Sequence, residues 1–307
     1  MPTQMLTFRA MNSTFEIRID SKYEISFEAL TFLNSETERL EQIMSRFRET
    51  SELTFLNRKL HKWNTITEIM LDVLKRTEEK WVEMKGAFDP RVLADLVQLG
   101  YSGVEVSQYQ SRDHFLFEWN NEGQVKFSTP IDLGGIGKGY TVDYLSNLIE
   151  RECKNDLTGY FINGGGDMII YGTQEDGSPW NIGVEDPIHS ENDLSMALSI
   201  SGKKTAICTS AVWKNKWKHK NQTVHHLINP WTKLPYQGNI VSATAFGKTC
   251  VDAEVYAKCL FIQDEQKNLT LPFLPYILIN NQKEILCSNK LNSNITWIFS
   301  GFRFSFE

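Results

Sequence analysis

The sequence lacks any pair of cysteines in the close spacing of a zinc-binding or redox motif. Its five cysteines, an odd number, are scattered along the chain at Cys153, Cys208, Cys250, Cys259 and Cys287. A disulfide framework or a structural zinc site usually requires evenly paired or closely spaced cysteines. We therefore expect neither, and reduced thiols fit a cytoplasmic setting.

Long uninterrupted apolar stretches are also missing. The first twenty residues, MPTQMLTFRAMNSTFEIRID, alternate apolar and polar side chains, which predicts a strand and not the apolar centre of a signal peptide. No window approaches the length that is needed to cross a bilayer. We expect no membrane span and a cytoplasmic protein, or an exported one if an export signal has been trimmed.

Long runs of Lys and Arg are absent too, and the 307 residues carry a formal net charge of −6. Because nucleic-acid surfaces use clustered basic side chains to neutralise phosphates, we expect no nucleic-acid partner. The nearest approach to a basic patch is WKNKWKHK, residues 213–220. A solvated loop or strand edge is the simplest interpretation of so short a run.

No internal repeat, low-complexity tract or linker rich in Pro and Ser divides the chain. We expect a single domain over 1–307, with two closely packed subdomains, roughly 1–130 and 131–307, as the other possibility. Strands and helices are interspersed without the regular alternation of a doubly wound sheet. The fold class expected is therefore α+β, with a strand-rich second half.

Apolar spacing predicts the individual elements. The expected helices end near Arg46, span 65–84, follow Pro90, include the stripe Val142, Leu145, Leu148 and Ile149, and span 250–262. The segment 46–59 is polar and predicts a turn. The expected strands lie at 115–119, 124–128, 159–172, 180–186, 194–202, 205–211, 224–230 and 240–247.

The segment IDLGGIGKGYTVDYL, residues 131–145, has four glycines within six residues, preceded by Asp132 and interrupted by Lys138. A glycine-rich turn from a strand into a helix brings backbone amides close to an anion, so a phosphate group is the expected guest. The spelling fits neither a Walker loop, because Gly139 follows Lys138, nor the GxGxxG of dinucleotide-binding folds. A plain tight turn is the alternative, but the acid and the base favour a binding site.

Two further segments are candidates for a site. NGGGDMIIYG, residues 163–172, places Asp167 after three glycines, which predicts a hairpin or bulge as readily as a ligand contact. His225 and His226 lie in a strand that breaks at Pro230. Adjacent strand residues point to opposite faces, so at most one histidine serves a given pocket.

These segments, in this order, resemble the ApbE family of flavin transferases, which cleave FAD and attach FMN to a hydroxyl of another protein. AMNSTFEI is similar to the family's opening strand, usually spelled with Met-Gly-Thr, and KGAFDPRV is similar to its Gly-Ala-Phe-Asp-Pro. IDLGGIGKGYTVD is similar to Asp-Leu-Gly-Gly-Ile-Ala-Lys-Gly-Tyr. Further similar segments, in family order, are MSRFRETSELTFLN, FINGGGDMIIYG, WNIGVEDP, AICTSA, HHLINPWTKLP and SATAF. The resemblance covers most of the chain.

The resemblance implies an ApbE-like fold, with mixed and antiparallel sheets, flanking helices and a flavin site in a central cleft. It implies an FAD:protein FMN transferase that joins FMN through a phosphoester bond to Thr or Ser of a target flavoprotein and releases AMP. It also implies a Mg²⁺ ion near the pyrophosphate, held in part by the backbone carbonyl of Gly135. The residues that it implies for the FAD site are Met11, Phe47, Ala87, Phe88, Asp89, Asp132, Lys138 and Ile228.

The side chains at these positions suit the parts of FAD. Met11 and Phe47 suit a flat ring system, while Lys138 and the amides of Gly137 and Gly139 suit phosphate oxygens. We expect Asp132 to bond a polar edge of the dinucleotide.

Two residues are expected to be catalytic. Phosphoryl transfer depends on positioning and charge neutralisation, so Lys138 is expected to stabilise charge on the leaving phosphate. His226, at the position of the family's His before Ile-x-Pro, is expected to act as general base, since a near-neutral pKa suits removal of a hydroxyl proton. A packed structural histidine is the alternative.

The helix CVDAEVYAKCLFI, residues 250–262, departs from the family. The family places an Asp and, four residues later, a metal-ligating Thr on one helix face. Those positions hold Glu254 and Lys258 here, or Asp252 and Tyr256 in a less favoured register. Glu can ligate Mg²⁺, but a Lys ammonium cannot.

Two explanations of this departure are open. In the first, Lys258 replaces a cation beside the pyrophosphate, an attraction of roughly several kcal/mol in a partly dry site. In the second, Glu254 and Lys258 form a helix-surface ion pair worth about 0.3–0.5 kcal/mol, and the metal site is lost. An FAD-binding protein or an FAD pyrophosphatase with an altered metal site is therefore the alternative function.

Overall fold

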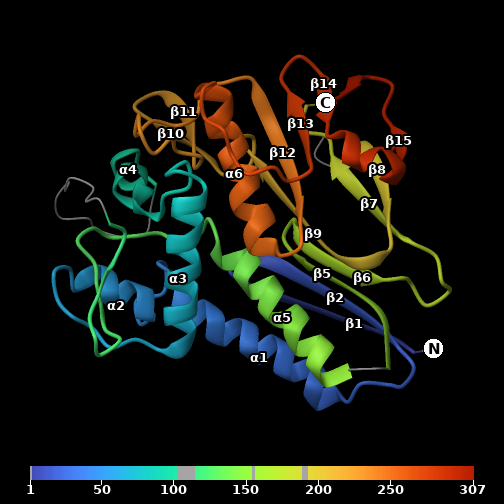
Figure 1. Cartoon of the computed structure of the whole chain (residues 1–307), viewed down its shortest axis with the longest axis horizontal. Coiled ribbons are helices and arrows are strands. Elements are labelled where there is room, and N and C mark those ends of the chain that lie inside the picture. Colours follow the sequence, from blue (N-terminus) through green and yellow to red (C-terminus); the bar gives the residue numbers. More distant parts are fainter. Residues whose placement is uncertain (1, 102–114, 154–155, 189–192) are drawn as a thin grey trace.

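The protein, seen in a computed structural model that describes residues 2–101, 115–153, 156–188 and 193–307, is built on one large sheet (Figure 1). Neighbouring strands of this sheet are antiparallel except for the last pair, β14 and β16. In spatial order the strands are β1 (Thr3–Ala10), β2 (Ser13–Ser21), β5 (Leu157–Gly164), β6 (Asp167–Gly172), β9 (Gly202–Ala211), β12 (Ile240–Gly247), β13 (Tyr276–Asn280), β14 (Glu284–Cys287) and β16 (Arg303–Phe306).

Three smaller sheets accompany it. The strands are β7 (Trp180–Glu185), β8 (Leu194–Ile200) and β15 (Ile295–Ile298) in one sheet, β10 (Lys216–His219) and β11 (Gln222–His225) in the second, and β3 (Glu118–Trp119) and β4 (Val125–Lys126) in the third. Strands and helices are interspersed along the chain, which confirms the expected α+β class. The strands expected at 115–119 and 124–128 shorten to β3 and β4.

The helices form where apolar spacing and capping agree. They are α1 (Phe27–Met44), α2 (Glu52–Arg58), α3 (Glu68–Glu83), the 3₁₀ turns η1 (Pro90–Val92) and η3 (Asn289–Asn294), α4 (Leu93–Gln98), α5 (Gly137–Cys153) and α6 (Cys250–Glu265). The side chains of Ser26, Ser51, Thr67 and Thr249 each accept a backbone N–H of the helix that they precede. Pro90 stands in the first turn of η1, as expected.

The large sheet is covered on both faces. Helices α5 and α6 pack on β5, β6, β9 and β12, and α1 packs on α5, in front of the sheet in Figure 1. Their apolar side chains, such as Leu145 and Val255, share a core with Phe15 and Ile17 of β2. The sheet of β7, β8 and β15 covers the other face, where Leu198 contributes to a second core.

Three expectations about local structure were wrong. The N-terminus is not one strand but the hairpin of β1 and β2, which turns at Met11 and Asn12 with φ of 51° and 56°. The segment 46–59 is not only a turn, because its second half forms α2 and buries Leu53 and Leu56. Four strands after residue 272 were not anticipated.

The large sheet takes strands from both sides of residue 130, since β2 of the hairpin β1–β2 pairs with β5 of the later part. How the chain divides into domains stays a prediction. Among the described residues, no helix combines the length and the apolar character that a bilayer crossing requires.

Candidate active site

A cavity of about 1000 Å³ opens beside the N-terminal end of α5. Its walls come from the β1–β2 turn, the end of α1, the segment before η1, the glycine segment, the end of β9, the loop after β11, and α6. The expected site residues on these walls are Met11, Phe47, Ala87, Phe88, Asp89, Asp132, Gly135, Lys138, His226, Ile228 and Lys258. Glu254, the other expected site residue, does not line the cavity.

Two positions of the glycine segment, Gly135 and Gly139, are packed too tightly for a side chain. A Cβ at Gly139 would lie 2.8 Å from the carbonyl carbon of Cys250 and from Glu254 Oε2, so α5 and α6 approach closely only because position 139 has none. At Gly135, a Cβ would lie 3.1 Å from the ring of Phe88. The glycines are required by helix packing around the cavity as well as by the turn.

The amides of this segment are not available to phosphate in the way that we expected. The N–H of Gly137 donates to the carbonyl of Leu133 at 2.7 Å, and the N–H of Gly139 donates to Glu254 Oε2 at 2.8 Å. Both donors are therefore satisfied inside the protein, and we expect the side chains of Lys138 and Lys258 to supply contacts to an anion.

The second glycine motif forms a turn and also serves the site. Gly165 and Gly166 have φ of 75° and 97° and close the hairpin of β5 and β6, which confirms the hairpin interpretation. The turn also places Asp167, which is buried, in an ion pair with Lys138. Since the Lys138 side chain is 30% exposed and Asp167 only 3%, the ammonium lies between the cavity and the carboxylate.

Glu254 lies behind the cavity wall, fully buried, and touches two lysines. Its Oε1 is 3.1 Å from Lys258 Nζ and 3.8 Å from Lys138 Nζ. Burial opposes ionisation, but the charges of Lys258 and Lys138 and the Gly139 N–H hold the pKa of Glu254 below its ordinary value. The expected helix-surface ion pair is therefore wrong in its location: the pair forms, but in the interior of the protein.

The expected Mg²⁺ ion does not fit these residues. Both oxygens of Glu254 already face cationic or N–H groups, and the Lys258 ammonium has no lone pair to offer a metal. In the part of the chain that the structure describes, no three His, Cys, Asp or Glu side chains form a group that could hold a metal ion. The alternative register is wrong as well, because neither Asp252 nor Tyr256 lines the cavity and Asp252 pairs with Lys80 of α3.

The two adjacent histidines have different roles, but the strand expected over 224–230 was wrong in its extent, because β11 ends at His225 and His226 follows it. His225 Nε2 lies 3.0 Å from the carbonyl oxygen of Tyr236, so this ring is held by the fold. His226 lines the cavity, and its Nδ1 is buried without a hydrogen-bond partner among the described residues.

The near-neutral pKa expected for His226 is wrong in the ligand-free protein. Burial, with the charges of Lys258, His225 and Lys138, lowers the pKa of His226 to about 3. The ring is therefore neutral at pH 7 and able to accept a proton, but it is a weak base.

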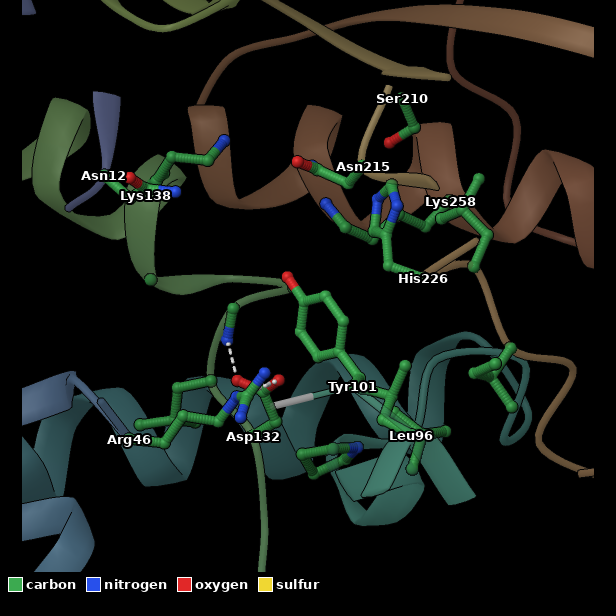
Figure 2. A pocket seen from close by; sticks show the side chains of 18 of the residues that line it. Asn12, Arg46, Leu96, Tyr101, Asp132, Lys138, Ser210, Asn215, His226 and Lys258 are labelled. Atoms are coloured by element: carbon green, nitrogen blue, oxygen red, sulfur yellow. Dashed lines mark hydrogen bonds and ion pairs between the residues drawn. The ribbon is translucent and has the colours of Figure 1, made fainter. Parts of the chain in front are cut away.

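Arg46 and Tyr101 line the cavity and were not anticipated from the sequence. The Arg46 Nε donates to Asp132 Oδ2 at 2.9 Å, and the guanidinium lies 4.0 Å from the ring centroid of Phe47 and 4.9 Å from that of Tyr101. Figure 2 shows Arg46, Asp132 and Tyr101 on one side of the cavity, with Lys138, Lys258 and His226 on the other. Arg46 stands directly before Phe47 in the sequence, and this was the available signal.

The remaining expected residues shape the same wall. Ala87 and Phe88 are buried, and Asp89 is held by Arg91, whose backbone N–H donates to Asp89 Oδ1 at 2.8 Å. Asp132 Oδ1 accepts the Gly134 N–H at 2.7 Å. Asp89 and Asp132 thus organise their loops in addition to lining the cavity.

The basic run 213–220 is divided between surface and site. Lys216, Lys218 and Lys220 are exposed on the hairpin of β10 and β11, as the simplest interpretation predicted. Trp213, Lys214 and Asn215, however, line the cavity, which the sequence reading missed. The signal was the interleaving of Trp with Lys.

Fold and site together define an α+β protein whose cavity suits an anionic ligand with a flat ring. Two lysines and a histidine suit phosphate oxygens, while Phe47 and Tyr101 offer aromatic faces.

Comparison with known proteins places the chain more closely. The ApbE family profile matches residues 11–272, so the chain belongs to the ApbE family. The FAD:protein FMN transferase of Escherichia coli K12 is 25% identical over 247 residues, 74% of this chain and 68% of that one. The FAD:protein FMN transferase of Vibrio cholerae is 26% identical over 261 residues, 78% of this chain and 75% of that one.

Solved structures agree on the fold. The ApbE protein of Thermotoga maritima superposes with a TM-score of 0.83 at 21% identity, covering 96% of this chain and 100% of that one. The flavin transferase ApbE of Vibrio cholerae gives a TM-score of 0.71 at 21% identity, covering 98% of each chain. The ApbE-like fold is therefore confirmed.

Proposed function

We propose that this protein is an FAD:protein FMN transferase. The observation that carries the proposal is the convergence of the residues expected at the FAD site on one cavity, beside Lys138, Lys258 and His226. Relatives that align over about three quarters of the chain bear the same activity in their names. The partners are FAD and a target flavoprotein that presents a Thr or Ser hydroxyl.

The reaction transfers FMN between two oxygens. The acceptor hydroxyl oxygen forms a bond to the FMN-side phosphorus, the bond from that phosphorus to the bridging oxygen breaks, and AMP leaves with the bridging oxygen. Lys138 and Lys258 face the cavity with their ammonium groups and neutralise phosphate charge. Asp167 and Glu254 fix these two amines from behind.

His226 receives the proton of the acceptor hydroxyl in this proposal. The charges of Lys258 and Lys138 contribute to its low pKa, and a bound diphosphate offsets both. Substrate binding therefore raises the basicity of the ring when a base is required. Arg46, held by Asp132, presents its guanidinium between two aromatic rings and orients a flat ligand at the other side of the cavity.

The resemblance implies Mg²⁺, but the residues at the expected position do not fit a divalent cation. This same departure is the observation that favours a second candidate, an FAD pyrophosphatase or an FAD-binding protein.

One assay distinguishes these functions. The protein is incubated with FAD and a flavoprotein acceptor segment, and flavin fluorescence on a denaturing gel and AMP in solution are measured. A labelled acceptor with AMP is expected; AMP alone identifies a pyrophosphatase, and bound FAD without either product identifies a binding protein. His226→Ala should retain FAD binding and abolish transfer, and unchanged transfer would remove His226 from the mechanism.

A further inference from the structure

Lys258 is held in position by contacts on three sides. Its Nζ lies 3.1 Å from Glu254 Oε1 and 3.4 Å from the Glu254 carbonyl oxygen, one helical turn earlier. Its stem packs against Gly135, where a Cβ would stand 3.6 Å from Lys258 Cδ. The side chain lines the cavity and is 20% exposed. Lys258 is therefore a preorganised cation and not a mobile surface lysine.

The four charges at this wall are arranged by depth. Glu254 and Asp167 have side chains that are 0% and 3% exposed, whereas those of Lys258 and Lys138 are 20% and 30% exposed. The group is neutral in formal charge, but both amines lie on the cavity side of the carboxylates. A ligand in the cavity meets two cations first, and this suits the two negative phosphates of a dinucleotide.

The same arrangement opposes a divalent metal. An ion near Gly135 would approach two ammonium groups, and Glu254, the carboxylate expected to ligate it, already contacts both lysines and the Gly139 N–H. Like charges at contact distance in a partly buried site repel strongly. This wall therefore presents side-chain cations where the resemblance implies a metal ion.

We propose that Lys258, oriented by Glu254, takes the place of the divalent cation, so that FAD binding and FMN transfer proceed without any divalent metal. This inference rests on the proposed function. Lys258 and Lys138 contact the diphosphate together, and Glu254 acts as a positioning residue.

The first experiment uses the wild-type protein alone. FAD affinity and the rate of FMN transfer are measured with EDTA and with Mg²⁺ in excess. We expect the two dissociation constants and the two rates to agree within about twofold. Binding or transfer that is lost in EDTA and restored by Mg²⁺ would overturn the inference while the proposed function stands. Absence of FAD binding in both conditions would overturn the proposed function itself.

Variants then test the residue. Lys258→Met keeps the stem and removes the charge, and we expect FAD affinity in EDTA to fall at least tenfold. Lys267→Met is the matched control, because Lys267, just after α6, also pairs with an acid three residues away, Asp264, but is 77% exposed. This control should bind FAD as the wild type does. Unchanged affinity in Lys258→Met, with folding checked by thermal melting, contradicts the proposal.

The double variant Glu254→Asp with Lys258→Thr tests the exchange in reverse. It supplies a carboxylate and a hydroxyl four residues apart on α6, which are oxygen ligands that Mg²⁺ accepts. We expect its FAD affinity to be weak in EDTA and to recover at least tenfold with Mg²⁺. A double variant with the same affinity in both conditions would contradict the exchange of Lys258 for a metal ion.

Discussion

At the residue scale, the site depends on where side chains are absent as much as on where they are present. Because Gly139 has no side chain, α6 can approach α5 closely. That approach brings Glu254 Oε1 to within 3.8 Å of Lys138 Nζ. Spacing alone suggested a phosphate loop, but the packing partner of each glycine is far away in sequence. Close approach between distant segments is therefore the part that the sequence could not reveal.

Gly139→Ala tests this packing. A methyl group would lie 2.8 Å from the Cys250 carbonyl atoms, so we expect a loss of about 1–3 kcal/mol in unfolding free energy and weaker FAD binding. Gly137→Ala is the control, because a Cβ there would meet Met44 Sδ at an ordinary 3.7 Å. Denaturant unfolding measures both variants, and equal stabilities would refute the packing argument.

The acid dependence of stability should expose His226. Its folded pKa, about 3, lies below the ordinary 6.5, so the folded state binds fewer protons between these pH values. Unfolding free energy should therefore decrease by up to about 1.4 kcal/mol for each pH unit as the pH falls from 6.5 toward 3. His226→Asn should remove this slope in denaturant titrations, and an unchanged slope would contradict the burial of a neutral ring.

Asp143 should act in the opposite direction. Burial raises its pKa from 3.8 to about 6, although the N–H groups of Cys250 and Val251 donate to it. The folded state keeps this proton longer, so the contribution of Asp143 to stability is present below pH 3.8 and is lost as the pH rises through 6. Asp143→Asn should remove this loss. If His226→Asn and Asp143→Asn change the pH slope of the unfolding free energy in the same direction, at least one of these two pKa shifts is wrong.

At the element scale, the predictable parts were those with local signals. Helices α1, α3, α5 and α6 follow their apolar spacing, and β5, β6 and β12 follow alternation and turn glycines. Helix α2 was missed because its seven residues contain only a few apolar positions. The N-terminal turn was missed because it uses Met11 and Asn12, without a glycine, at positive φ.

Trp217 of the hairpin of β10 and β11 packs against a residue of the cavity wall. Trp217 Nε1 donates to the Leu99 carbonyl at 2.6 Å, and its ring centroid lies 4.6 Å from that of Tyr101. Removing the ring in Trp217→Ala should release Tyr101 and weaken FAD binding by about 2–10-fold, the worth of one aromatic pair. Trp217→Phe keeps a ring and should bind FAD nearly as the wild type does. Fluorescence titration measures the FAD affinity of each protein. Equal affinity for the wild type and both variants would show that the hairpin does not contribute to FAD binding.

At the scale of the whole molecule, the sheet separates two apolar cores that differ in their relation to the cavity. The core on the helix side supports α5 and α6, which carry Lys138 and Lys258, while the core under β7 and β8 contains none of the described residues that line the cavity. The order of elements predicted the α+β class. It did not predict the large sheet, whose edge is formed by strands from the end of the chain. Pairing between distant strands leaves little trace in local sequence.

Two matched substitutions test whether only the helix-side core supports the cavity. Leu145 on α5 and Leu198 on β8 are both fully buried, so each Leu→Ala change should lower unfolding free energy by about 2–5 kcal/mol. Only Leu145→Ala should also weaken FAD binding, because α5 positions Lys138. Thermal melting and FAD titration give the two readouts, and a loss of FAD affinity in Leu198→Ala as large as in Leu145→Ala would contradict the separation.

The buried pairing of Glu254 with Lys258 constrains how this helix can change. Replacing Lys258 alone removes one of the two cations that face the buried Glu254, and replacing Glu254 alone leaves Lys258 without its carboxylate, so we expect the two positions to change together. The joint signature is therefore a glutamate followed four residues later by the lysine of an Ala-Lys-Cys-Leu-Phe segment. This pair can identify other proteins with the same altered wall. Neither residue alone would distinguish them.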